Sequence, residues 1–226
     1  MNPLIILGGG GGAEQSIESD AYFASKIGND AKLLYIPVAM DETVYTYQEC
    51  YSWIKSVFAP FGIREIEMFT DLLVIPDDII ESYSAVYIGG GNTFQLLDEL
   101  REKNAIGKLL NFAHHGGCIY GGSAGAIILG KNINTALHDD PNDIGLKDLT
   151  GLNLTNDYVV WCHYHLNQDA EIINYVIERS EKLIAIPEAS AVAYDLDSFK
   201  NIGSESCYIF HRSGSKTEIK VGTVFE

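Results

Sequence analysis

Short apolar runs alternate with amphipathic stretches along most of the chain. The runs at 4–7, 32–38 and 84–88 are nearly continuous in apolar residues, as is typical of strands buried on both faces of a sheet. From Tyr47 to Phe58, by contrast, apolar side chains recur at helical spacing. Strands that alternate with helices in this way predict a mostly parallel sheet with helices on both of its faces.

The same alternation continues to about residue 190 and then gives way to a β-rich end. We expect further strands at 66–69, 118–120, 158–162 and 183–186, and helices at 15–27, 43–58, 94–103, 106–114 and 170–179. The segments 192–194, 207–210 and 217–224 have the character of hairpins or edge strands. No repeat or linker interrupts the pattern, so we expect one α/β domain over residues 1–226.

Composition and charge narrow the classes of partner. The 226 residues are 46% hydrophobic, enough for one large core and too apolar for a disordered chain. A net charge of −16 argues against nucleic acid and anionic membranes as partners. The four cysteines form no CxxC pair, and no signal peptide or membrane-spanning run is visible. We therefore expect free thiols and a cytoplasmic location.

The segment 118–130 carries the clearest chemical signal. It consists of a short apolar strand, a serine between glycines, and the start of a helix, with Gly121, Ser123 and Gly125 in the pattern G-x-S-x-G. A sharp strand-to-helix turn of this kind presents a serine hydroxyl at the end of a sheet. The amides of the following helix point toward a negative charge forming at that serine. A glycine-rich turn with an inert serine is the alternative interpretation.

Three glycine-rich segments, 8–12, 89–91 and 121–125, each follow a predicted strand. Loops at the carboxyl ends of strands form the ligand sites of open α/β sheets. The first segment is a weak match to a dinucleotide-binding loop, because neither a ribose-binding acid nor a phosphate-binding lysine follows it. Residues 89–91 offer backbone N–H groups for an oxyanion hole. They also suit a tight turn with Asn92 or Thr93 as a helix N-cap.

A serine nucleophile needs a base, and the base needs an orienting acid. His163 directly follows the strand 158–162 and is our candidate base. With His165 and Asp169 it could also be part of a metal site, although no further ligands at characteristic spacing accompany them. The acid is either Glu188, just past the strand 183–186, or an aspartate of the 139–140 loop.

Four segments together resemble the peptidase E family of serine peptidases (family S51), which includes cyanophycinase-like enzymes. They lie in the order found in that family: Tyr87 to Leu97, Gly121 to Ala126, Cys162 to Tyr164, and Ile186 to Glu188. The first two are specific, and the last two gain weight from their position.

The resemblance implies a three-layer, flavodoxin-like α/β sandwich, similar to class I glutamine amidotransferase domains. It implies Ser123 as the nucleophile, His163 as the base and Glu188 as the third member of a triad, with Asp139 and Asp140 as second choice for the acid. It also implies an oxyanion hole formed by backbone amides near Gly90, Gly91 and Ala124. Neither a metal nor an organic cofactor is implied.

One departure from the family concerns the substrate. Peptidase E removes N-terminal aspartate, and an arginine follows the histidine region in the family; here residues 167–174 contain no Arg or Lys. We therefore expect hydrolysis of small peptides by a monomer or homodimer, without a clear basis for aspartate preference. The alternative is a noncatalytic protein, or one that binds a nucleotide or another small molecule through its glycine-rich loops.

Overall fold

The computed structural model describes residues 3–76 and 78–226, and it confirms the predicted alternation of strands and helices. The strands are β1 (Leu4–Gly8), β2 (Lys32–Ile36), β3 (Glu65–Met68), β4 (Ala85–Ile88), β5 (Cys118–Gly122), β6 (Tyr158–Trp161), β7 (Lys182–Ala185), β8 (Ala191–Asp195), β9 (Ser198–Asn201), β10 (Cys207–Phe210), β11 (Lys216–Ile219) and β12 (Val224–Phe225). The α-helices are α1 (Ile17–Ile27), α2 (Tyr47–Phe58), α3 (Ile79–Ser82), α4 (Thr93–Glu102), α5 (Ala105–His114), α6 (Ala124–Leu129) and α7 (Asp169–Arg179). Short 3₁₀ turns connect several of them.

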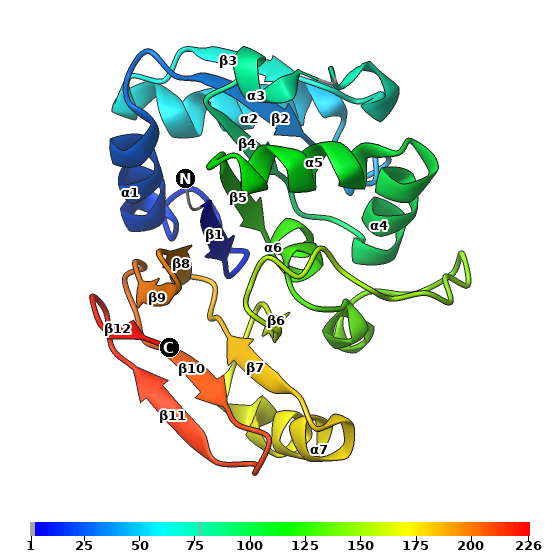
Figure 1. Cartoon of the computed structure of the whole chain (residues 1–226), viewed down its shortest axis with the longest axis vertical. Coiled ribbons are helices and arrows are strands. Elements are labelled where there is room, and N and C mark those ends of the chain that lie inside the picture. Colours follow the sequence, from blue (N-terminus) through cyan, green and yellow to red (C-terminus); the bar gives the residue numbers. More distant parts are fainter. Residues whose placement is uncertain (1–2, 77) are drawn as a thin grey trace.

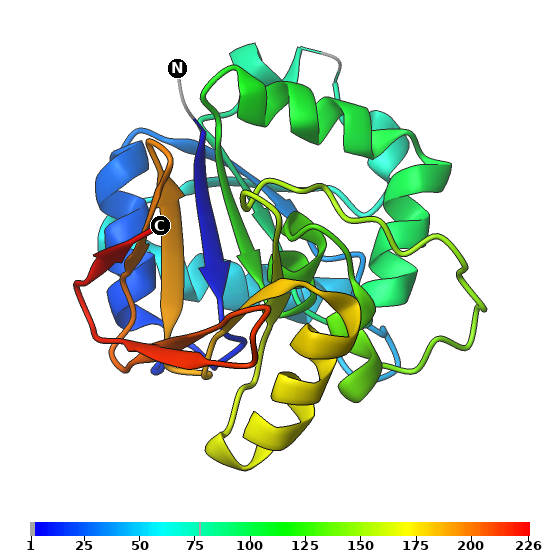
Figure 2. The same ribbon diagram turned by 60° about the horizontal axis from the view of Figure 1, so that its bottom comes forward.

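The larger sheet has the strand order β12-β9-β8-β1-β5-β4-β2-β3. Its strands β1, β5, β4, β2 and β3 run parallel, whereas β8, β9 and β12 join one edge in antiparallel pairs. Figure 2 shows β1 lying between β5 and the antiparallel β8. The β-rich end of the chain is thus divided: β8, β9 and β12 extend the main sheet, whereas β10 and β11 pair with β7 in a second sheet.

Side chains of the parallel strands alternate between two cores. Along β1, Ile5 and Leu7 contribute to the core that also holds α3 to α6, whereas Ile6 contributes to the core that holds α1 and α2. This alternation is the two-residue period of a strand. It explains the nearly continuous apolar runs, because both faces of these strands are covered by helices.

The strands predicted at 158–162 and 183–186 do not join the main sheet. They form β6 and β7 of a second sheet with the order β11-β10-β7-β6. The reason is that β8 already pairs with the free edge of β1, so this edge is closed to β6. One face of the second sheet completes the main core, and the other face packs on α7. The second sheet and α7 lie in the lower part of Figure 1.

The strand register brings the three glycine-rich segments together. Gly8 of β1 is the register partner of Gly122 in β5, and Ile88 of β4 is the partner of Gly121. The loops that follow these parallel strands therefore leave the sheet side by side at its carboxyl edge. The four cysteines are free and buried, and none of the described helices is long and apolar enough to cross a membrane.

Candidate active site

Ser123 stands on a strained turn between β5 and α6. Its backbone angles are φ 51° and ψ −114°, a region that costs a non-glycine residue about 1–3 kcal/mol. Hydrogen bonds hold the turn in place. Its N–H donates to the Gly8 carbonyl at 3.1 Å, and its own carbonyl accepts from Ala126 and Ile127. The serine therefore sits at the exposed end of the strand in the position that the sequence pattern predicted.

The two glycines of the G-x-S-x-G pattern are required by close packing. A Cβ atom on Gly121 would lie 2.3 Å from the carbonyl oxygen of Gly125, and a Cβ on Gly125 would lie 2.2 Å from that of Ile88. Both distances are far inside van der Waals contact. Gly121 and Gly125 thus let helix α6 approach β4 and β5 closely enough to form the turn.

His163 follows β6 and reaches Ser123 from the second sheet. Its backbone φ is 51°, and its N–H donates to the Gly9 carbonyl at 2.9 Å. The imidazole Nε2 lies 2.8 Å from Ser123 Oγ, a hydrogen-bond distance suited to proton transfer. The strands before these two residues were both expected in the predicted parallel sheet; the structure instead joins Ser123 and His163 across two sheets through the end of β1.

Glu188 lies on the other side of the His163 ring. Its Oε1 is 3.3 Å from His163 Nδ1, and its Oε2 accepts a hydrogen bond of 3.1 Å from Gln15 Nε2. The hydrogen bond from Gln15, followed by that from His163, lowers the pKa of Glu188. The carboxylate is therefore ionised at neutral pH and able to orient an imidazole.

The glycine run after β1 is in contact with all three of these residues. The carbonyls of Gly8 and Gly9 accept from Ser123 and His163, and the Gly11 N–H donates to the Glu188 carbonyl at 3.2 Å.

The sequence interpretation missed this role. A Cβ atom added to Gly9 would lie 1.8 Å from the Pro187 carbonyl oxygen, and one added to Gly10 would lie 2.2 Å from the His163 ring. A Cβ atom on Gly11 would lie 2.5 Å from the Glu188 carbonyl oxygen. A glycine run after a strand was visible in the sequence, but its partners lie more than 100 residues away.

Two of the predicted oxyanion-hole residues, Gly90 and Ala124, lie next to Ser123, and Gly91 follows Gly90 in the chain. A Cβ on Gly90 would lie 3.2 Å from Ser123 Cβ, so the backbone of Gly90 runs alongside the serine. Ala124 begins α6. Within the described chain, the amides of Gly90, Gly91 and Ala124 donate to no protein acceptor. These N–H groups are therefore free to donate to a ligand oxygen, those of Gly90 and Ala124 next to the serine.

The predicted turn function of the second glycine segment also holds. The Asn92 side chain accepts from the Gln95 N–H at 3.0 Å and caps helix α4.

The other candidate residues lie elsewhere. Asp140 accepts a hydrogen bond of 2.8 Å from the Thr93 N–H at the start of α4, and Asp139 is exposed to solvent. Asp169 pairs with Lys216 at 2.8 Å. Of the residues described, no three His, Cys, Asp or Glu side chains are grouped as metal ligands would be. The structure thus brings Glu188, and not Asp140, into contact with His163.

The family model of peptidase family S51 matches residues 4–202. The chain belongs to peptidase family S51. It is a serine-type peptidase with the α/β fold of this family, a flavodoxin-like sandwich similar to glutamine amidotransferase domains. The glycine-flanked serine and the histidine after β6 both lie within the matched segment.

Named relatives of this S51 chain are bacterial peptidases E. It is 24% identical to peptidase E of Escherichia coli O1:K1 / APEC over 204 residues, and this alignment covers 85% of each chain. It is 25% identical to peptidase E of Shewanella denitrificans over 160 residues, and this alignment covers 66% of each chain.

Two solved structures share the fold. A structure described as a peptidase E protein from Listeria monocytogenes EGD-e superposes with a TM-score of 0.71 at 21% identity, over 90% of this chain and 99% of the other. A peptidase from an acI-B1 actinobacterium superposes with a TM-score of 0.76 at 18% identity, over 100% and 97%.

A cavity of about 620 Å³ opens beside the serine of the S51 site. It lies between the carboxyl edge of the main sheet and helix α2. Its walls are the glycine-rich loops together with aromatic and sulfur-containing side chains; the lining residues are Gly10, Gly11, Gly12, Tyr35, Met40, Tyr45, Glu49, Cys50, Trp53, Tyr87, Gly89, Gly90, Gly122 and Ser123.

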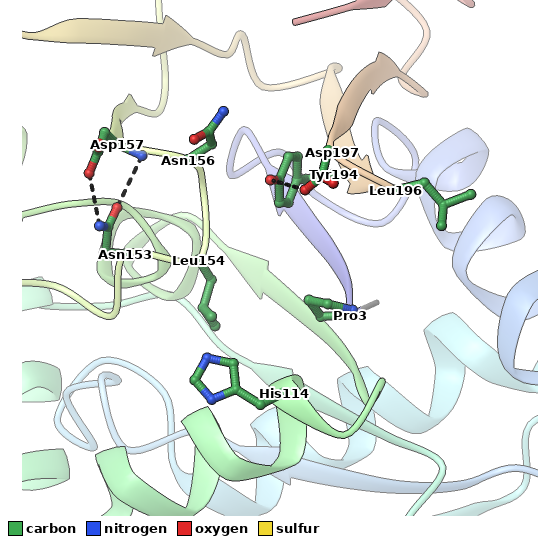
Figure 3. Close-up of a pocket in the computed structure, with 9 residues that line it drawn as sticks. All are labelled: Pro3, His114, Asn153, Leu154, Asn156, Asp157, Tyr194, Leu196 and Asp197. Atoms are coloured by element: carbon green, nitrogen blue, oxygen red, sulfur yellow. Dashed lines mark hydrogen bonds between the residues drawn. The ribbon is translucent and has the colours of Figure 1, made fainter. Parts of the chain in front are cut away.

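A second cavity, of about 400 Å³, lies at the opposite end of the strands (Figure 3). One of its lining residues is Pro3, which directly precedes β1. Hydrogen bonds join two pairs of its lining residues: the Asn153 side chain donates to the Asp157 carboxylate and accepts from the Asp157 N–H, and the Tyr194 hydroxyl donates to Asp197. None of the S51 site residues lines it.

Proposed function

We propose that the chain hydrolyses small peptides with Ser123 as nucleophile, His163 as general base and Glu188 as the acid that orients the base. The observation that carries the proposal is the 2.8 Å contact between Ser123 Oγ and His163 Nε2, with Glu188 on the opposite ring nitrogen. This is the arrangement of nucleophile, base and orienting group that peptide-bond hydrolysis by a serine requires.

The reaction follows from this geometry. His163 Nε2 takes the hydroxyl proton as Ser123 Oγ attacks the peptide carbonyl carbon. The amides of Gly90, Gly91 and Ala124 donate to the oxygen that becomes negative. His163 then protonates the leaving amine, and an acyl-enzyme remains on Ser123. Water, activated by His163 in the same way, hydrolyses the ester and restores the serine.

Glu188 stabilises the imidazolium that forms in each step. Its low pKa keeps it ionised, and its contact with His163 Nδ1 keeps Nε2 free to accept the serine proton. Asp140 remains the second choice for the orienting acid. Its carboxylate, however, accepts a hydrogen bond from the Thr93 N–H at the N-terminus of α4, where a negative charge suits the helix dipole.

Activity of four variants on a dipeptide substrate tests these roles. We expect Ser123→Ala to lose turnover at least 1,000-fold, on the order found for a triad member, and Glu188→Gln to lose more than Asp139→Asn or Asp140→Asn. An unchanged rate in Ser123→Ala would contradict the serine mechanism and favour a binding protein. If only an aspartate variant were strongly impaired, the acid would be wrongly assigned.

We further propose that residues 1–226 act as one hydrolytic domain in the cytoplasm, as a monomer or homodimer. The core shared by both sheets supports the single domain, and the four buried free thiols suit a reducing compartment.

A further inference from the structure

Most of the side chains that line the cavity beside Ser123 are aromatic or sulfur-containing. Tyr87 is one of the lining residues, and Tyr35 and Trp53, which also line the cavity, pack edge-on against its ring at centroid distances of 5.8 and 6.2 Å. Met40 and Tyr45 also line it. At about 620 Å³ it falls within the range of roughly 300–1,000 Å³ typical of small-ligand sites.

We propose that this cavity binds a large aromatic or aliphatic side chain of the substrate residue whose carbonyl is attacked. This inference rests on the proposed function and adds the substrate class. An aromatic side chain would bury its apolar surface against the lining rings and gain edge-to-face contacts with them.

The charge in the cavity disfavours an acidic substrate side chain. Glu49 is the single charged residue lining it, within the described chain. Its carboxylate accepts from the Thr46 N–H and hydroxyl, both at 2.8 Å, and these bonds lower its pKa. An aspartate side chain in the cavity would therefore meet an ionised carboxylate and no cation to pair with it.

The cost of removing a charge from water argues against a basic side chain. Glu49 closes the capping box that begins helix α2, and its Oε2 is already engaged with Thr46. A lysine would have to leave water to pair with the remaining carboxylate oxygen, whereas an aromatic side chain loses no charge hydration.

The position of His163 indicates which side of the scissile bond the cavity serves. The leaving amine must lie near His163 Nε2 to receive its proton. Ser123, Gly90 and Gly122 line the cavity, whereas His163 does not. The acyl side of the substrate, which is attached to Ser123 Oγ and held at the Gly90 amide, therefore faces the cavity.

Two dipeptide series measure this preference with the purified wild-type chain. In the series X-Leu, with X as Phe, Tyr, Leu, Ala, Asp or Lys, we expect kcat/KM for Phe and Tyr to exceed that for Ala, Asp and Lys at least tenfold. In the reversed series Leu-X, we expect less than threefold variation. A preference for Asp-Leu, Lys-Leu or Ala-Leu would overturn the inference, and so would discrimination only in the reversed series.

Variants of α2 link the preference to the cavity. Trp53→Ala should lower the ratio of kcat/KM for Phe-Leu over Ala-Leu about tenfold, and Trp53→Phe should retain most of it. The matched control is Tyr51→Ala, which removes an aromatic ring from the same helix outside the cavity and should leave the ratio within twofold of wild type. An unchanged ratio in Trp53→Ala would contradict the assignment.

The outcomes separate this inference from the proposed function. If the wild-type chain cleaved no dipeptide and Ser123 failed to react with a fluorophosphonate, the proposed function and the inference about the cavity would both be wrong. If cleavage depended on Ser123 but favoured small or charged X residues, the proposed function would stand and the inference about the cavity would be wrong.

Discussion

At the scale of single residues, the candidate site depends on hydrogen bonds between segments far apart in the chain. Ser123 and His163 both adopt positive φ, and each is held there by a carbonyl at the end of β1. Gln15, 173 residues from Glu188, donates to its carboxylate. Ser123, His163 and Glu188 were predictable because each follows a recognisable strand. Gln15 was not, because nothing in its local sequence indicates a distant partner.

Gln15 should act as a positioning residue for Glu188. Its Nε2 bonds Glu188 Oε2 and its Oε1 accepts from the Gly12 N–H at 3.0 Å. We expect Gln15→Leu to lower kcat/KM by up to tenfold, because a hydrogen bond to a charged group contributes about 1.5 kcal/mol or less at an exposed site.

Gln15→Glu should lower activity further, because a second carboxylate beside Glu188 would raise the pKa of Glu188. The acid limb of its pH–rate profile should therefore move to higher pH, a change that loss of stability alone would not produce. Gln48→Leu, an exposed glutamine on α2, is the matched control. Wild-type activity and pH profile in both Gln15 variants would rule out the positioning role.

At the scale of elements, hydrophobic periodicity located the strands and helices, but it did not assign strands to sheets. The strand 158–162 had the apolar character of a central strand and was expected in the main sheet. It lies in a second sheet because β8, from the β-rich end, occupies the edge of β1. Such competition for an edge depends on long-range packing, which a local pattern does not encode.

The glycine run after β1 is the element that holds the site together, and Gly10 tests this. Gly10 has φ 103°, and a Cβ there would lie 2.2 Å from His163 Cε1. We expect Gly10→Ala to displace the imidazole and lower kcat/KM about 100-fold, the scale of loss from a misplaced catalytic group.

Gly107→Ala is the control for this substitution. Gly107 lies in helix α5, and a Cβ atom there would meet nothing within 4 Å, so alanine should leave activity unchanged and stabilise the fold by up to about 1 kcal/mol. Full activity in Gly10→Ala would show that the run does not position His163.

At the scale of the whole molecule, one buried carboxyl should make stability depend on pH. Asp20 in α1 is 2% exposed, and burial raises its pKa to about 6 despite hydrogen bonds from Ser16 and Tyr120. An unfolded aspartate has a pKa of about 3.9. Between these values the folded chain binds more protons than the unfolded chain, so the free energy of unfolding falls as pH rises.

We expect this group to lower the free energy of unfolding by about 2 kcal/mol between pH 4 and pH 7. Asp20→Asn should remove that decrease, because the amide stays neutral and its oxygen can still accept from Ser16. Urea unfolding at several pH values measures the difference, with the exposed Asp30→Asn as control. Parallel pH curves for wild type and Asp20→Asn would contradict the expectation.

The central claim, an activated serine at position 123, is tested most directly by covalent labelling. The native chain is treated with a fluorophosphonate at neutral pH, and the modified residue is mapped by peptide mass spectrometry. Because His163 Nε2 lies 2.8 Å from Ser123 Oγ, we predict one adduct on Ser123 and strongly slowed labelling in His163→Ala. An unlabelled Ser123, or labelling at the same rate without His163, would contradict the account.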